Sequence, residues 1–202
     1  MSRSGLSHSE QVEHLIAGGS RFIQIREKEL SPKQFYNEVS RAIDIAREAG
    51  TTIIVNDRVD VALASKAHGV HLGQHDLPVT AARKILGDSV IIGLSTHNLD
   101  QAAKAAVLPV DYIAFGPIFP TATKKDLDPV VGLEKLRQIR EIVGKIPLVA
   151  IGGVKLSNLN EMLAAGADSV ALISVLYTSV SDISVRYAEL AAQAATLNNF
   201  KK

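Results

Sequence analysis

The sequence has 202 residues and contains no cysteine, no tryptophan and no long hydrophobic run. Without cysteine the chain has neither disulfide bonds nor thiolate metal sites, which fits a reducing compartment. A membrane-spanning helix needs about 18 consecutive apolar residues. Residues 1–6 also lack the apolar stretch of a signal peptide. We therefore expect a soluble, cytoplasmic protein.

Excess charge of one sign is also lacking, because 22 Lys and Arg residues against 21 Asp and Glu residues leave a net charge of +1. Binding to nucleic acid or to anionic membranes needs clustered excess Lys and Arg, so we expect neither as a partner. Any anionic ligand must therefore be bound locally. Hydrophobic residues make up 47% of the chain, enough for the core of one domain over residues 1–202.

Short runs rich in Val and Ile recur along the chain and are typical of buried strands. These runs cover residues 22–25, 52–55, 70–72, 90–94, 112–115, 148–151 and 170–173. Segments of helical period separate them, such as the one in which Phe35, Val39 and Ile43 share a face. The alternation predicts an α/β fold with a parallel sheet, and it favours a (β/α)8 TIM barrel over an open doubly wound sheet.

The start of the chain does not fit a complete barrel, which has eight strands. Ser7 and Glu10 have capping-box spacing, and Val12 and Leu15 begin an apolar stripe, so the chain opens on a helix. The sequence therefore predicts a barrel that lacks its first strand. We expect either a truncated version of a longer product, or a partner or rearranged segment that closes the gap.

Catalytic groups in such barrels follow the carboxyl ends of the strands. After the first run, alternation places Gln24, Arg26 and Lys28 on one face, where two cations and an amide suit a phosphate or a diphosphate. The alternative is a solvated strand end whose cations pair with carboxylates.

The next two strand ends carry Asn56-Asp57 and Asp76. Two carboxylates on adjacent strands suit Mg²⁺, which completes its octahedral shell with water and substrate phosphate. Either Asp alone would equally cap a helix. A zinc site built on His71 and its neighbouring histidines is disfavoured, because His71 lies within a strand and no carboxylate or thiolate completes the shell.

Two later loops suit phosphate groups. Residues 116–125 place two threonines beside two lysines, with Gly and Pro fixing the backbone. Residues 151–153 and 173–174 end the last two strands, where barrels often bind phosphate through glycine amides and a helix N-terminus. A plain surface loop is the alternative for the first segment.

Together these strand ends resemble the thiamine phosphate synthase family, from Gln24 to Ser174. The motifs that carry the resemblance are Gln-x-Arg-x-Lys, Asn-Asp, Gly-x-His-x-Gly-Gln-x-Asp, Gly-Pro-x-Phe-x-Thr-x-Thr-Lys and Ile-Gly-Gly. The resemblance implies a transferase of thiamine biosynthesis that joins a pyrimidinylmethyl diphosphate to a thiazole phosphate by a dissociative mechanism. It would release pyrophosphate, and CO₂ when the thiazole carries a 2-carboxylate.

The resemblance also implies roles for single residues. Arg26, Lys28 and Lys124 would stabilise the leaving pyrophosphate, and Asp57 and Asp76 would bind Mg²⁺. The pyrimidine diphosphate site would comprise Gln24, Ile25, Arg26, Glu27, Lys28, Asn56, Ser95 and Lys124. The thiazole phosphate site would comprise Thr121, Ala122, Thr123, Gly153, Ile173 and Ser174.

Two residues depart from the family pattern. His68 and His75 stand where many members of the family carry acidic residues. Two other functions remain open at this point, a related thiazole tautomerase and a non-catalytic truncated barrel. The tautomerase needs no pyrimidine diphosphate site, and the presence of the full set argues against it: Arg26, Lys28, Asp57, Asp76 and Lys124. The sequence leaves open whether the protein forms a homo-oligomer.

Overall fold

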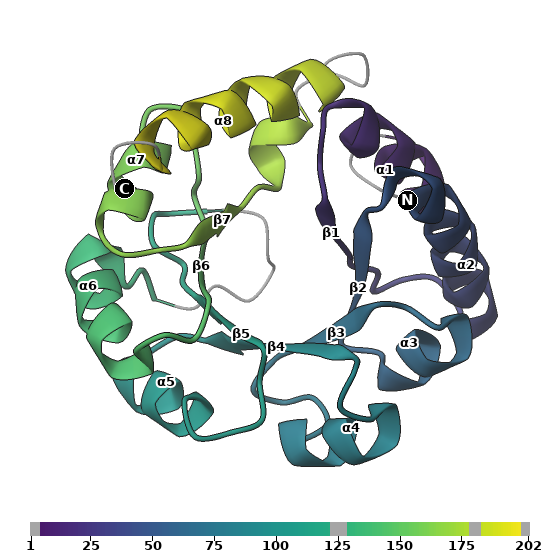
Figure 1. Ribbon diagram of the computed structural model, residues 1–202, viewed down its shortest axis with the longest axis horizontal. Coiled ribbons are helices and arrows are strands. Elements are labelled where there is room, and N and C mark those ends of the chain that lie inside the picture. The colour runs from purple at the N-terminus through teal and green to yellow at the C-terminus, as the bar shows by residue number, and fades with distance from the viewer. Residues whose placement is uncertain (1–4, 122–128, 178–182, 199–202) are drawn as a thin grey trace. The chain divides into compact units, whose positions relative to one another are not determined.

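A computed structural model describes residues 5–121, 129–177 and 183–198 (Figure 1). The chain has an α/β fold in which strands and helices alternate. In chain order the elements are α1 His8–Ala17, β1 Phe22–Ile25, α2 Pro32–Ala49, β2 Thr52–Asn56, α3 Val59–Ser65, β3 Gly69–Leu72, α4 Val79–Leu86, β4 Ile91–Thr96, α5 Leu99–Ala105, β5 Tyr112–Phe115, α6 Gly132–Val143, β6 Leu148–Ile151, α7 Leu159–Ala164, β7 Ser169–Ala171, the 3₁₀ helix η1 Ser174–Leu176 and α8 Ile183–Asn198.

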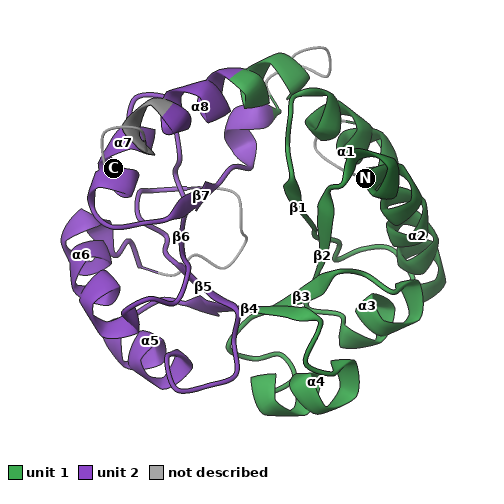
Figure 2. Cartoon of the chain, viewed as in Figure 1, with its two compact units in different colours: residues 1–92, 177–188 green, residues 93–176, 189–202 purple. Residues whose placement is uncertain are grey.

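The chain divides into two compact units (Figure 2). Unit 1 contains residues 1–92 and 177–188, and unit 2 contains residues 93–176 and 189–202. Within each unit the neighbouring strands follow their order in the sequence. This order is typical of repeated βα units.

In unit 1, β1 pairs in parallel with β2, and β2 pairs in parallel with β3. Helices α1 to α3 lie along one side of these strands (Figure 1). Helix α2 begins at a capping box formed by Ser31 and Gln34 and ends at Gly50, whose left-handed φ of 63° suits glycine. Its side chains Phe35 and Val39 are buried, and burial of each contributes roughly 1.5–3 kcal/mol of transfer free energy.

In unit 2, β4, β5, β6 and β7 pair in parallel in that order. Helices α5 to α7 lie along one side of β5 to β7 (Figure 1). The strands present fully buried Ile113, Phe115 and Leu148, and α6 buries Leu136 and Ile139. Because both the strands and the helix face are apolar, the same residues form the core and hold the strand ends in register.

The structure confirms the α/β fold and the seven predicted strands. Strand β4 runs to Thr96, two residues beyond the predicted end, and β7 ends at Ala171 rather than at Ile173. The predicted helix at the start is α1, and both hydrogen bonds of the Ser7–Glu10 capping box are present. Among the described residues no strand precedes α1.

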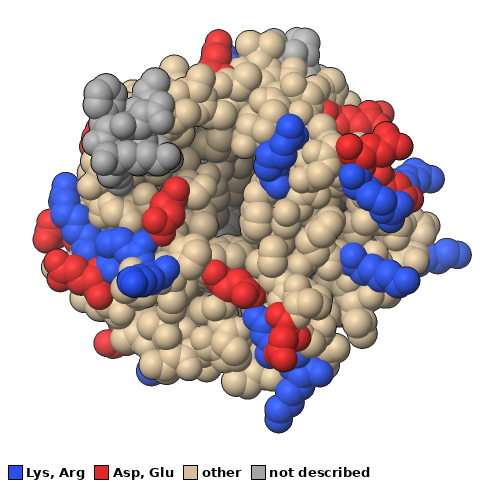
Figure 3. Space-filling model, viewed as in Figure 1, with Lys and Arg blue, Asp and Glu red and all other residues tan. Residues whose placement is uncertain are grey.

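Two further features concern membranes and surface charge. None of the helices in the described part of the chain is long and apolar enough to cross a membrane. Basic and acidic side chains are interspersed on the face drawn in Figure 3.

Candidate active site

The strand ends of unit 1 bring a lysine and an aspartate into contact. Lys28, three residues beyond β1, donates a hydrogen bond from Nζ to Oδ2 of Asp57, which follows β2. Because β1 and β2 are paired neighbours, with Ile25 opposite Val55, their carboxyl ends lie side by side. Asp57 adopts a left-handed φ of 63°, and its amide donates to the carbonyl of His71 on β3 at 2.8 Å. The backbone is therefore bent to aim this carboxylate.

A second carboxylate, Asp76, interacts with Asp57. Burial raises the pKa of Asp57, but hydrogen bonds with Lys28 and Asp76 and the charges of Lys28 and Arg26 outweigh burial and hold that pKa below its ordinary value. Burial and the nearby Asp57 raise the pKa of Asp76, although the Gly73 amide donates to its Oδ2 at 2.7 Å. Asp57 thus favours its ionised form and Asp76 its protonated form, and the charges of Lys28 and Arg26 act on Asp57.

This pair has the chemistry of a Mg²⁺ site. Mg²⁺ typically takes one or two protein carboxylates and leaves its other positions to water and substrate phosphate. A divalent cation beside Asp57 and Asp76 would relieve their repulsion. The described residues hold no cluster of three or more His, Asp or Glu side chains able to bind a metal, so any ion here needs ligands from water or substrate.

The other predicted residues of unit 1 lie around this contact. Gln24 and Arg26 are exposed, whereas Ile25 is buried, as the alternation of β1 predicts. Asn56 is buried at the end of β2, opposite His71 of β3. Arg26 lies close enough to Asp57 for its charge to lower the pKa of that carboxyl group.

Glu27 behaves differently from the residues on either side of it. Its Oε1 accepts hydrogen bonds from the amides of Lys28 and Glu29, both at 2.6 Å, and of Leu30 at 3.3 Å. Its Oε2 lies 2.9 Å from Nε2 of His8. Burial raises the pKa of Glu27, but these hydrogen bonds outweigh it and lower the pKa to about 2. Both carboxylate oxygens of Glu27 are therefore engaged in contacts within the protein.

In unit 2 the loop after β5 packs on two glycines that follow β6. The amide of Ile118 donates to Ile151 at 2.9 Å, and that of Phe119 donates to Gly152 at 3.2 Å. Gly153 has a φ of 67°, and a Cβ atom there would lie 2.6 Å from Cβ of Phe119. Only glycine allows the two backbones to approach so closely in this conformation.

His97 ties the end of β4 to the same loop. Its Nδ1 lies 2.6 Å from the carbonyl oxygen of Gly116, and its amide donates to Gln101 at 2.7 Å. Ser95, a predicted ligand, is half-buried two residues earlier on β4. His97 was not among the residues predicted from the sequence, although it directly follows β4.

The remaining described residues among those predicted for unit 2 lie outside its strands. Thr121 is half-buried, Ile173 is exposed, and Ser174 opens η1. The carbonyl of Gly153 accepts a hydrogen bond from Nδ2 of Asn158 at 3.0 Å. Ala122, Thr123 and Lys124 lie outside the described residues.

Comparison with known proteins identifies the family of this chain. The sequence profile described as thiamine monophosphate synthase matches residues 2–176. The chain belongs to this family. It is 44% identical over 188 residues to a thiamine-phosphate synthase of Chloroflexus aurantiacus, covering 93% of this chain and 86% of the relative. It is 48% identical over 168 residues to a thiamine-phosphate synthase of Moorella thermoacetica, covering 83% and 79%.

Solved structures agree with the family membership. A thiamine phosphate pyrophosphorylase from Pyrococcus furiosus superposes with a TM-score of 0.85 at 37% identity, covering 93% of this chain and 89% of the other. The family resemblance inferred from the strand-end motifs is therefore confirmed. The roles of the individual residues stay predictions, because the comparisons identify no site residue.

Proposed function

We propose that this member of the thiamine monophosphate synthase family is itself a thiamine phosphate synthase. It would couple (4-amino-2-methyl-5-pyrimidinyl)methyl diphosphate with 4-methyl-5-(2-phosphooxyethyl)thiazole or its 2-carboxylate. The products would be thiamine phosphate, pyrophosphate and, from the carboxylated thiazole, CO₂. The relatives named thiamine-phosphate synthase support this activity, since the chain matches most of their length.

The observation that carries the proposal is the group of charges at the strand ends of unit 1. Lys28 contacts Asp57, Arg26 lies near it, and Asp76 interacts with the same carboxylate. A diphosphate that leaves with the electron pair of its C–O bond needs positive charge on its oxygens. Arg26 and Lys28 would supply that charge at fixed positions, and charge held in place in this way usually lowers such barriers more than any other effect.

Asp57 and Asp76 would hold Mg²⁺, which supplies further positive charge to the diphosphate. When the C–O bond breaks, the aminopyrimidine ring stabilises the remaining methylene cation. The thiazole nitrogen then forms the C–N bond with its own lone pair, so no general base is needed. In unit 2, Thr121, Gly153, Ile173 and Ser174 would bind the thiazole phosphate through hydroxyl and backbone groups. We also propose the finer fold prediction, a (β/α)8-type barrel without its first strand.

The decisive experiment is incubation with both substrates and Mg²⁺, with thiamine phosphate detected by mass. We expect coupling to stop with EDTA and to return with added Mg²⁺. At limiting Mg²⁺, Asp57→Asn and Asp76→Asn should lower coupling by about 10². Asp44→Asn is the matched control, because Asp44 is an exposed carboxylate on α2 paired with Arg47.

Three outcomes would contradict the proposal in different ways. Coupling that survives EDTA would refute the metal assignment. Isomerisation of the thiazole carboxylate without coupling would point to a tautomerase, which should be indifferent to both Asn variants. No turnover of either kind, with the chain folded, would favour the non-catalytic barrel.

A further inference from the structure

The loop that carries Lys28 is held by a single carboxylate. Oε1 of Glu27 accepts three consecutive amides, those of Lys28, Glu29 and Leu30. The next residue, Ser31, begins the capping box of α2. The segment between β1 and α2 is thereby wrapped around one oxygen atom. Three donors on one anionic acceptor fix the direction of the backbone at Lys28.

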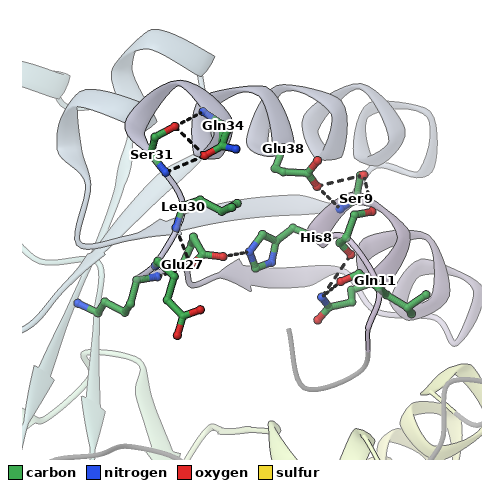
Figure 4. A network of polar contacts seen from close by, with 12 residues as sticks. His8, Ser9, Gln11, Glu27, Leu30, Ser31, Gln34 and Glu38 are labelled. Atoms are coloured by element: carbon green, nitrogen blue, oxygen red, sulfur yellow. Dashed lines mark hydrogen bonds and ion pairs between the residues drawn. The ribbon is translucent and has the colours of Figure 1, made fainter. Parts of the chain in front are cut away.

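The other oxygen of Glu27 connects this loop to the N-terminal helix. Oε2 lies 2.9 Å from Nε2 of His8, the first residue of α1 (Figure 4). The two side chains are 14% and 12% exposed, so water competes little for this contact. The His8 ring also lies edge-on to Phe35 of α2, with ring centroids 6.2 Å apart. Helix α1 thus fixes the orientation of the carboxylate.

We infer that Glu27 is a positioning residue, clamped by His8, which holds Lys28 toward Asp57 and so shapes the diphosphate site. The inference rests on the proposed function for the role of Lys28, but not for the loop geometry. Lys28 is 54% exposed and has four rotatable side-chain bonds. Its backbone must be fixed if its ammonium group is to meet a leaving group reproducibly. Glu27 therefore acts through Lys28 rather than by touching the substrate.

The variants separate the two sets of contacts that Glu27 makes, one with the loop amides and one with His8. Glu27→Ala removes both oxygens, whereas Glu27→Gln keeps one oxygen for the loop amides. His8→Phe keeps the ring against Phe35 and removes only the bond to Oε2. Glu38→Ala is the matched control, because Glu38 accepts from the amide of Ser9 at 3.2 Å and so joins α1 to α2 without touching the loop.

The first measurement is hydrogen exchange of the amides of residues 28–30, which requires no activity. We expect exchange in Glu27→Ala to rise by about tenfold or more, since each lost bond contributes about 1 kcal/mol. His8→Phe and Glu27→Gln should show smaller rises, and Glu38→Ala should resemble the unmodified chain. Unchanged exchange in Glu27→Ala would overturn the inference whatever the protein catalyses.

The second measurement is steady-state coupling well below the melting temperature. In Glu27→Ala we expect kcat/KM for the pyrimidine diphosphate to fall by about 10 to 10², the usual effect of a slightly displaced group. KM for the thiazole phosphate should stay constant, and Glu27→Gln should recover most of the loss. Equal losses for both substrates would reduce Glu27 to a merely structural residue. Absence of coupling by the unmodified chain would instead refute the proposed function.

Discussion

The candidate sites of the two units consist of different chemical groups. In unit 1 the site consists of charged side chains. Lys28 contacts Asp57, and Glu27 accepts a hydrogen bond from the amide of Lys28. Unit 2 uses backbone, with the loop after β5 lying directly on Gly152 and Gly153. A charge can be removed while its residue keeps its shape, whereas a glycine in close contact admits no side chain. Substitutions should therefore impair chemistry in unit 1 and structure in unit 2.

The largest effect is expected for Gly153→Ala in unit 2. A Cβ atom there would lie 2.6 Å from Cβ of Phe119 and 2.7 Å from the carbonyl oxygen of Pro120. The positive φ of 67° adds roughly 1–2 kcal/mol of strain, and overpacking adds about 1–3 kcal/mol. We expect the free energy of unfolding, measured in urea, to fall by the sum of both.

Gly132→Ala separates these two causes. Gly132 also has a positive φ, of 77°, but a Cβ atom there would meet nothing within 4 Å. This variant should lose only the strain contribution. Equal losses at both positions would show that close packing of the loop on Gly153 contributes nothing.

In unit 1, Arg26→Ala should lower turnover far more than stability. Arg26 is exposed, so its removal leaves no cavity, but its charge acts on Asp57 and on the proposed diphosphate. Loss of such a contact typically lowers kcat by about 10² or more. The control is Arg21→Ala, an exposed arginine that precedes the opposite end of β1. A change in KM alone, with kcat intact, would refute the role in leaving-group stabilisation.

The sequence predicted the strands better than it predicted the contacts between side chains. The sequence predicted the bounds of three strands correctly, because apolar runs bounded by polar residues indicate burial directly. These strands cover residues 22–25, 112–115 and 148–151. The contact of Glu27 with His8 was not foreseeable, since it joins residues 19 apart through a side-chain orientation. The role of Glu27 as a substrate ligand, predicted from its place in a motif, stays a prediction, because motif spacing does not show which way a side chain turns.

Glu27 should also give unit 1 a distinctive acid response. The pKa of Glu27 is lowered to about 2, so its hydrogen bonds stabilise the folded chain at neutral pH. That contribution, about 1.5–3 kcal/mol for hydrogen bonds to a charged group, is full above about pH 5, shrinks below the ordinary Glu pKa and is lost near pH 2. Glu27→Gln should therefore be less stable than the unmodified chain at neutral pH and converge with it in acid.

Urea unfolding at several pH values measures this convergence. The exposed Glu13→Gln on α1 provides the control and should show a constant, small difference. A Glu27→Gln difference that does not change with pH would mean that the bonds to residues 28–30 do not depend on the charge.

The smallest expected effect compares one equivalent position in the two units. Asp168 precedes β7 and accepts the amide of Leu148 at 2.8 Å, and His68 precedes β3 and accepts the amide of Ile53 through Nδ1 at 3.0 Å. Asp168 accepts with a carboxylate that Arg140 also contacts at 2.7 Å, whereas His68 accepts with a ring nitrogen. A carboxylate is the stronger acceptor of the two, so unit 2 should depend more on this bond than unit 1.

Alanine at each position removes the acceptor and tests the difference directly. We expect His68→Ala to lower the free energy of unfolding by about 1 kcal/mol, the net value of one hydrogen bond. Asp168→Ala should lower it by more, because a bond to a charged acceptor contributes more than a bond between neutral groups. If urea unfolding gave equal losses for the two variants, the charge of the acceptor would make no difference at this position, and β3 and β7 would be held equally well at their starts.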